Sequence, residues 1–341
     1  MIEPLLIRAD GGATIGLGHL VRSLALAEAW SHLGGAVAAV TASPRASPLS
    51  RAGVAVHAIT AAYPDPGDAA ATIATALAVG ARWVVCDGYA FDGGYVDALH
   101  AVGLRVLQID DGQAALDSSA DVLLNQNIGA ETMAYHVRPA ARLLLGTRFA
   151  LLRDSILRSA RPRDARAAPR RVVLLSGGSD VASLAPRSIR AFRAVAGPAI
   201  GCDVIIGQET TPATVVEAAA GDTRIAIHHD PLDPGRLMAA ADVAVTAAGS
   251  TCWELCYIGV PMIAVSVAGN QLPIASGLHA AGAAVDLGPH QSVSDAALAT
   301  ALQRLLGDAT KRTELAAHGQ SLVDGRGRER VVATLRGEEV P

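Results

Sequence analysis

Lysine is almost absent from this chain: its 341 residues include one lysine, Lys311, and arginine supplies all other fixed positive charge. Neither a Schiff-base lysine nor the phosphate-binding lysine of a P-loop is therefore available elsewhere. Aromatic side chains are also scarce, at 3%, which leaves few platforms on which nucleic-acid bases can stack. The formal net charge of −4 provides no positive field, so we expect no nucleic-acid partner.

Long hydrophobic runs are missing as well, although 51% of the residues are hydrophobic. Gly, Arg, Asp and Pro interrupt every apolar run before it reaches the roughly 18 residues that are needed to cross a bilayer. The first residues, MIEPLLIRAD, are typical of a strand and lack the basic and apolar regions of a signal peptide. We therefore expect a cytoplasmic protein without membrane insertion.

The chain has only four cysteines, and a cytosolic protein of this length does not need disulfides to fold. Cys252 and Cys256 lie four residues apart on one predicted helix, a spacing that suits two metal ligands or two thiols on a buried face. The buried pair is the interpretation that we prefer. We predict no structural metal.

The length suits two domains, and short apolar strands alternate with helical patterns in both halves, as in βαβ units with parallel sheets. We expect an amino-terminal domain at 1–157, an Arg-, Pro- and Ala-rich linker at 158–170 and a carboxyl-terminal domain at 171–341. Two such domains would face each other across a cleft at the carboxyl ends of their strands, where open α/β sheets bind ligands. The predicted strands are 5–10, 37–40, 54–59, 83–87, 105–110, 121–126, 171–180, 203–207, 224–229, 242–249 and 261–267.

The run IRADGGATIGLGHLVRSLALAEAW at residues 7–30 is an apolar strand, a glycine loop and an amphipathic helix that begins near His19. Its glycines are Gly11, Gly12, Gly16 and Gly18. Glycines allow the backbone to approach a ligand closely, and the N–H groups of a helix start attract anions. The helix dipole disfavours the imidazolium, so His19 suits a general base, and Asp10 or Asp87 could orient it. The alternative is a plain loop-to-helix junction with an incidental histidine.

A dinucleotide-binding site is disfavoured in this loop, because Val21, just before Arg22, stands where the third glycine of the dinucleotide fingerprint would let the helix pack.

Three glycine-containing segments of the second half follow predicted strands, and each has a structural alternative. They are Ser176-Gly177-Gly178-Ser179-Asp180, Gly249-Ser250-Thr251-Cys252-Trp253-Glu254 and Gly269-Asn270-Gln271. The first could bind phosphate or be a turn capped by Asp180. In the second, Glu254 could bind the two hydroxyls of a ribose or close a capping box with Thr251. The amides of the third could bind phosphate or sugar hydroxyls, or cap the next helix.

These motifs occur in an order that resembles a known family. GSTCWELCYIGVPMIAV resembles the nucleotide-binding signature of GT-B proteins that use UDP-sugars. Together with RADGGATIGLGHLVR, IDD at 109–111, LLNQN at 123–127, LLGTRFALLR at 144–153, LSGGSD at 175–180 and AGNQLPIA at 268–275, it resembles the UDP-sugar hydrolase of pseudaminic acid biosynthesis and its spore-coat relatives. The resemblance extends over about residues 5–288.

The resemblance implies an α/β GT-B fold with two Rossmann-like domains, a UDP-sugar substrate held mainly by the second domain, and no metal or other cofactor. It implies that His19 activates water and that Tyr89 lies near the substrate. With Asp10, whose place at a strand end could let it orient His19, the catalytic candidates are His19, Asp10 and Tyr89. The substrate-binding candidates are Gly16, Gly18, Arg22, Asp87, Gly177, Gly178, Ser179, Gly249, Ser250, Thr251, Glu254, Asn270 and Gln271.

The expected reaction is inverting hydrolysis of a UDP-2,4-diacetamido-2,4,6-trideoxyhexose or a similar amino sugar nucleotide. A glycosyltransferase in which His19 deprotonates an acceptor hydroxyl is the alternative, and a non-catalytic UDP-sugar-binding protein is a third. Family members often have a histidine between the Asp and the Tyr of the Asp87-Gly88-Tyr89 segment, a difference that concerns the sugar and not the UDP.

Overall fold

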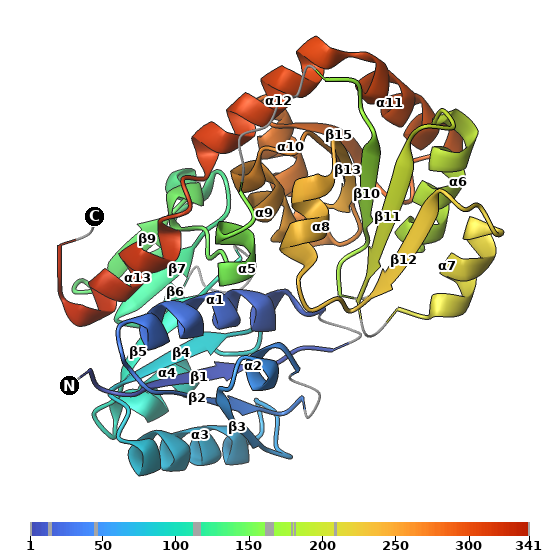
Figure 1. Cartoon of the computed structure of the whole chain (residues 1–341). Helices are drawn as coiled ribbons and strands as arrows, with labels where there is room; N and C mark the ends of the chain where they lie inside the picture. Colours follow the sequence, from blue (N-terminus) through green and yellow to red (C-terminus); the bar gives the residue numbers. More distant parts are fainter. Residues whose placement is uncertain are drawn as a thin grey trace. The chain divides into compact units, whose positions relative to one another are not determined.

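The computed structural model describes residues 2–12, 16–43, 47–111, 117–160, 167–178, 180, 182–207 and 210–339. The chain forms two compact units: unit 1 is Met1–Arg153 with Gly325–Pro341, and unit 2 is Asp154–Asp324. Each is an α/β unit built on a parallel sheet (Figure 1). Within the described part of the chain, every helix is too short or too polar to cross a membrane.

The sheet of unit 1 has the strand order β3-β2-β1-β4-β5-β7-β9, and all its neighbours pair in parallel. The order runs outward from β1 to β3 and then continues on the other side of β1, so the switch point lies between β1 and β4. Short strands β6 (Asp117–Ser118) and β8 (His136–Val137) pair separately. The sheet strands are β1 (Leu5–Ala9), β2 (Val37–Thr41), β3 (Ala55–Ala58), β4 (Trp83–Asp87), β5 (Arg105–Ile109), β7 (Val122–Asn125) and β9 (Arg142–Leu145).

Helices cover both faces of this sheet because its strands are apolar on both sides. One core joins Ile7 and Val85 of the sheet to Leu24 of α1, and the opposite core joins Leu6 to Leu99 of α4. The helical segments of unit 1 are α1 (Gly18–His32), α2 (Ser47–Arg51), α3 (Pro66–Val79), α4 (Gly93–His100), η1 (Ala130–Thr132), η2 (Thr147–Phe149) and α13 (Gly327–Arg336).

The last helix, α13, corrects the predicted domain boundary. The sequence predicts that 171–341 forms one domain, but the structure places Gly325–Pro341 in unit 1. Helix α13 lies beside α1 (Figure 1), and Val331 and Leu335 join the core that contains Trp30. The sequence of an amphipathic helix predicts which face of the helix is buried, but it does not predict which of two sheets the helix packs against.

Gly327 is the point at which α13 meets the rest of unit 1, and we expect Gly327→Ala to destabilise that unit by about 2 kcal/mol. A Cβ on Gly327 would lie 2.3 Å from the carbonyl oxygen of Ala150, and backbone cannot move aside cheaply. Denaturant unfolding measures the loss. Gly307→Ala is the matched control, since no atom lies within 4 Å of its added Cβ, and equal stabilities for the two variants would contradict the prediction.

Unit 2 repeats the arrangement with the strand order β12-β11-β10-β13-β14-β15, again parallel, and its switch point lies between β10 and β13. The strands are β10 (Arg171–Leu175), β11 (Gly201–Ile206), β12 (Ile225–His229), β13 (Val243–Ala247), β14 (Met262–Ser266) and β15 (Ala284–Pro289). The helical segments are α5 (Asp154–Leu157), α6 (Leu184–Val195), α7 (Pro212–Ala219), α8 (Pro234–Ala240), α9 (Thr251–Ile258), η3 (Gly269–Gln271), α10 (Leu272–Ala280), α11 (Asp295–Gly307) and α12 (Ala309–Leu322). The predicted linker at 158–170 belongs to unit 2 where it is described.

Candidate active site

The glycine loop after β1 delivers His19 to the first turn of α1, as the sequence predicts. Gly12 and Gly16 exchange backbone hydrogen bonds with N···O distances of 3.0 and 2.7 Å, and Gly16 has a φ of 75° that glycine tolerates best. The helix begins at Gly18 without a side-chain cap. His19 is 3% exposed, so the incidental surface histidine is excluded.

Asp87 orients His19. It is the last residue of β4, next to β1, and its Oδ1 lies 2.6 Å from Nδ1 of His19. A carboxylate at this distance accepts the Nδ1 proton, which assigns the lone pair of the neutral ring to Nε2. Nε2 has no hydrogen-bond partner among the described residues, so it can accept a proton.

Asp10, the other carboxylate that the sequence offers for this role, is held elsewhere. Its Oδ1 accepts hydrogen bonds from the Thr41 hydroxyl at 3.0 Å and the Ala42 N–H at 2.7 Å, and it pairs with Arg8 at 2.7 Å. The expectation that Asp10 contacts His19 is therefore wrong. Asp10 instead links the end of β1 to the end of β2.

Arg22 lies one helical turn after His19 and fixes the Asp87 carboxylate. Its Nε donates to Oδ2 at 2.7 Å and its Nη2 to Oδ1 at 2.5 Å, while its Nη1 donates to Asp111 at 2.5 Å. Burial alone would raise the pKa of Asp87, but the charges and hydrogen bonds of Arg22 and His19 lower it to about 2. From the sequence, Arg22 and Asp87 are substrate-binding candidates. In the structure both side chains are buried, and they hold His19 in place.

Tyr89 follows β4 and packs against the imidazole of His19. The two rings meet edge to face, with centroids 4.7 Å apart and planes at 81°. The Tyr89 hydroxyl donates to Oδ2 of Asp111 at 3.3 Å. Desolvation, and then the negative charge of Asp111, raises the pKa of Tyr89 to about 12, so the phenol stays neutral near pH 7.

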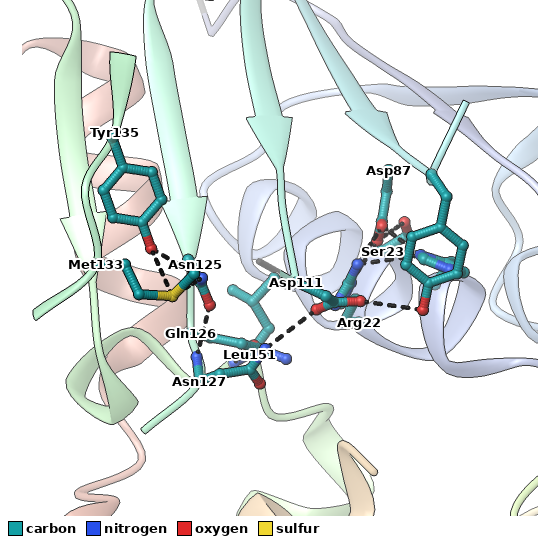
Figure 2. A network of polar contacts seen from close by, with 12 residues as sticks. Arg22, Ser23, Asp87, Asp111, Asn125, Gln126, Asn127, Met133, Tyr135 and Leu151 are labelled. Carbon is teal, nitrogen blue, oxygen red and sulfur yellow. Dashed lines mark hydrogen bonds and ion pairs between the residues drawn. The ribbon is translucent and has the colours of Figure 1, made fainter. Parts of the chain in front are cut away.

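A polar network continues from Asp111 along the ends of β5 and β7 (Figure 2). Nδ2 of Asn127 donates to Asp111 at 3.4 Å, and the Asn127 N–H donates to Oδ1 of Asn125 at 3.1 Å. Asn125 in turn donates to the Tyr135 hydroxyl at 2.9 Å, and Gln126 accepts the N–H of Leu151 at 2.9 Å. The sequence singles out IDD and LLNQN but assigns them no role. IDD begins at the last residue of β5, which pairs with β4, and LLNQN begins within β7, which pairs with β5.

The first predicted loop of unit 2 connects β10 to α6. Gly177 has a φ of 87°, and a Cβ on Gly207 would lie 2.2 Å from the carbonyl oxygen of Gly178, so the ends of β10 and β11 touch through their backbones. Ser179 lies outside the described residues. Asp180 accepts from the N–H groups of Leu184 at 2.6 Å and Ala185 at 3.1 Å, which confirms the capping interpretation of that residue.

The second loop, after β13, leads directly into α9. Ser250 is the N-cap residue and makes no side-chain capping bond, and Thr251 is the first residue of the helix. The predicted capping box needs Thr251 outside the helix, so it does not form in that register. Glu254 lies in the first turn of α9 and is 4% exposed.

The second and third loops of unit 2 lie side by side. Oε1 of Gln271 accepts the N–H of Val267 at 2.9 Å, and its Nε2 lies 3.7 Å from the position of a Cβ on Gly249. Asn270 belongs to the same short turn, η3. The structure therefore brings Gly249, Ser250, Asn270 and Gln271 to the carboxyl ends of β13 and β14, as expected from parallel strands.

Metal ligands do not cluster in the parts of the chain that the structure describes: it contains no group of three or more His, Cys, Asp or Glu side chains that could hold an ion. Cys252 and Cys256 are free and buried, which confirms the interpretation as packed thiols. Burial raises the pKa of Cys252 to about 12, so its side chain packs as a neutral thiol near pH 7.

Comparisons with known proteins bear on both the fold and the sequence motifs. No family model matches the chain. The spore coat polysaccharide biosynthesis protein SpsG of Bacillus subtilis (strain 168) is 36% identical over 104 residues, 30% of this chain and 31% of that protein. The match thus spans about a third of the length of this curated relative.

Two solved structures resemble the chain over nearly its whole length. MurG of Acinetobacter baumannii has a TM-score of 0.67 at 17% identity, covering 98% of this chain and 100% of that one. MnaA of S. aureus, solved with UDP, has a TM-score of 0.67 at 11% identity, covering 98% and 96%. The two units each have a parallel sheet whose strand order reverses next to its first strand, and the likeness to these structures extends over nearly the whole chain. This chain therefore has the GT-B fold.

Proposed function

We propose that this protein hydrolyses a UDP-sugar with inversion at the anomeric carbon, releasing UDP and the free sugar. The observation that carries the proposal is the His19–Asp87 contact of 2.6 Å, which orients the ring and leaves Nε2 to take a proton. Support for a sugar nucleotide comes from the sequence likeness to SpsG, named for polysaccharide biosynthesis, and from the fold likeness to MnaA, solved with UDP.

In the proposed step, Nε2 of His19 takes one proton from water while the water oxygen bonds to the anomeric carbon. The bond from that carbon to the diphosphate oxygen breaks, and its electron pair leaves with UDP. The imidazolium that results lies against the Asp87 carboxylate, which stabilises it. Gly16 and Gly18 allow the backbone near His19 to approach the sugar. The Tyr89 ring packs against the His19 imidazole.

We assign the UDP moiety to the loops of unit 2. Backbone N–H groups at glycine turns and helix starts bind the anionic oxygens of a diphosphate. A buried carboxylate in the first turn of α9 suits the two ribose hydroxyls, a role that we give to Glu254. The proposed set is Gly177, Gly178, Ser179, Gly249, Ser250, Thr251, Glu254, Asn270 and Gln271. No metal or cofactor takes part in this proposal.

An NMR time course of the full chain with UDP-2,4-diacetamido-2,4,6-trideoxyhexose, without acceptor or added metal, tests the proposal. We expect free UDP and a sugar whose first-formed anomer is inverted. Release of UDP that depends wholly on an added acceptor would replace the hydrolase by a glycosyltransferase in which His19 deprotonates the acceptor hydroxyl. Tight UDP binding in calorimetry, with every sugar nucleotide surviving incubation, would leave a binding protein only.

A further inference from the structure

Asp111 is the junction of the polar network around His19, although it does not touch His19 itself. Its carboxylate accepts Nη1 of Arg22 at 2.5 Å, the Tyr89 hydroxyl at 3.3 Å and Nδ2 of Asn127 at 3.4 Å. The side chain of Asp111 is only 12% exposed, so water screens these contacts weakly. Figure 2 shows Asp111 between Arg22 on α1 and Asn127 after β7.

The charges of this network are unequal while His19 is neutral. Arg22 is one cation, and it pairs with two carboxylates, Asp87 and Asp111. Burial opposes the charge of Arg22, but Asp111 and Asp87 raise its pKa well above the ordinary value, so the cation is permanent. The network therefore has one excess negative charge, which a proton on His19 cancels.

Among the described residues, the following groups on the neighbouring elements do not remove that excess. At the end of β1, Asp10 adds another carboxylate, and Arg8, which pairs with it at 2.7 Å, also pairs with Asp68 at 2.5 Å. After β5, Asp110 is a further carboxyl residue beside Asp111 and is 6% exposed. After β4, Tyr89 contributes a neutral phenol, and after β7, Asn127 contributes a neutral amide. On α1, Ser23 is neutral and lies 3.5 Å from Oδ2 of Asp87.

We infer that Asp111 is a positioning residue that acts through Arg22 to supply the excess negative charge which the imidazolium of His19 neutralises when it takes a proton. Nη2 of Arg22 lies 3.0 Å from Nδ1 of His19 and would repel the imidazolium if Asp87 alone had to offset it. Asp111 takes up part of that charge. It also holds the hydroxyl of Tyr89, whose ring packs on His19, so it fixes the imidazole from two directions.

This inference rests on the proposed function for its catalytic meaning, and Asp111→Asn tests it. We expect a kcat roughly tenfold lower than wild type at neutral pH with little change in KM, because a less basic His19 is a weaker general base. The acid limb of the kcat profile should move to lower pH. Asp121→Asn is the matched control: Asp121 also contacts a histidine, His100 at 3.0 Å, and Arg138 at 3.7 Å, away from this network.

A second readout needs no substrate and so separates this inference from the proposed function. In NMR titrations, the His19 ring should protonate at lower pH in Asp111→Asn than in wild type, and at the wild-type pH in Asp121→Asn. A wild-type protein that hydrolyses no sugar nucleotide would refute the proposed function, while the ring titration still decides the role of Asp111.

Asn127→Asp provides the opposite change and guards against a variant that fails to fold. It adds a carboxyl group beside Asp111. The backbone N–H of residue 127 can still donate to Oδ1 of the Asn125 side chain. We expect the His19 ring to protonate at higher pH than in wild type. Titrations of folded Asp111→Asn and folded Asn127→Asp that both coincide with wild type would overturn the inference.

Discussion

Replacing His19 by asparagine is expected to reduce kcat by about a thousandfold while the protein still folds and binds UDP. The asparagine amide reaches about as far as Nδ1, so an N–H group remains to meet Oδ1 of Asp87, which lies 2.6 Å from Nδ1 in wild type. Nε2, the proposed proton acceptor, has no counterpart in the shorter side chain. This one substitution therefore removes the proposed general base while it keeps the contact with Asp87 that supports the fold.

The measurement is the NMR time course of sugar release for His19→Asn beside calorimetry with UDP. His57→Asn is the control, since His57 is an exposed residue of β3 and takes no part in the network. We expect wild-type turnover from the control and wild-type UDP affinity from both variants. If His19→Asn kept a substantial kcat, His19 would have to be removed from the mechanism.

The central strands could be predicted from the sequence, because a buried parallel strand is a continuous apolar run. The predicted strand 83–87 coincides with β4, and 105–110 contains β5. The sequence did not reveal β9 and β15, each of which lies at one edge of its sheet, although the strands at the opposite edges, β3 and β12, were predicted. β9 has only four residues and Leu143 within it is 40% exposed, while β15 contains Asp286, Gly288 and Pro289, which are uncommon in buried strands.

The position of His19 was visible in the sequence, but its partner was not. Asp10 and Asp87 both lie at the carboxyl ends of apolar strands in the sequence. Only the sheet register separates them: Ala9 pairs with Asp87, so Asp10 lies one residue beyond. Successive side chains on a strand point to opposite faces, which directs Asp10 toward Arg8 and Thr41. Asp111 needed the same information, since its contact with Arg22 spans 89 residues of sequence.

Asp87→Asn is expected to lower both stability and activity, by about 3 kcal/mol and roughly a thousandfold in kcat. An amide has one acceptor where the carboxylate has two, and it meets N–H donors from both Arg22 and His19. Its own N–H₂ group must then face a donor, or the imidazole must take the other tautomer and lose the lone pair on Nε2. Denaturant unfolding and the time course of sugar release measure the two losses. A variant as stable as wild type would show that this buried network does not hold unit 1 together.

The pH dependence of that stability difference identifies the carboxylate as its source. The folded-state pKa of Asp87 is about 2, below its ordinary value of 3.8, so its contribution is fully present above pH 3.8 and is lost as the pH falls through about 2. The gap between wild type and Asp87→Asn should therefore narrow by about 1 kcal/mol by about pH 3, and by about 2 kcal/mol by about pH 2. Trp30 and Trp83 can report on unit 1 in a Trp253→Phe background, where the lost indole N–H had no hydrogen-bond partner. A gap that stays constant with pH would mean that lost packing, and not a lost charge, destabilises the variant.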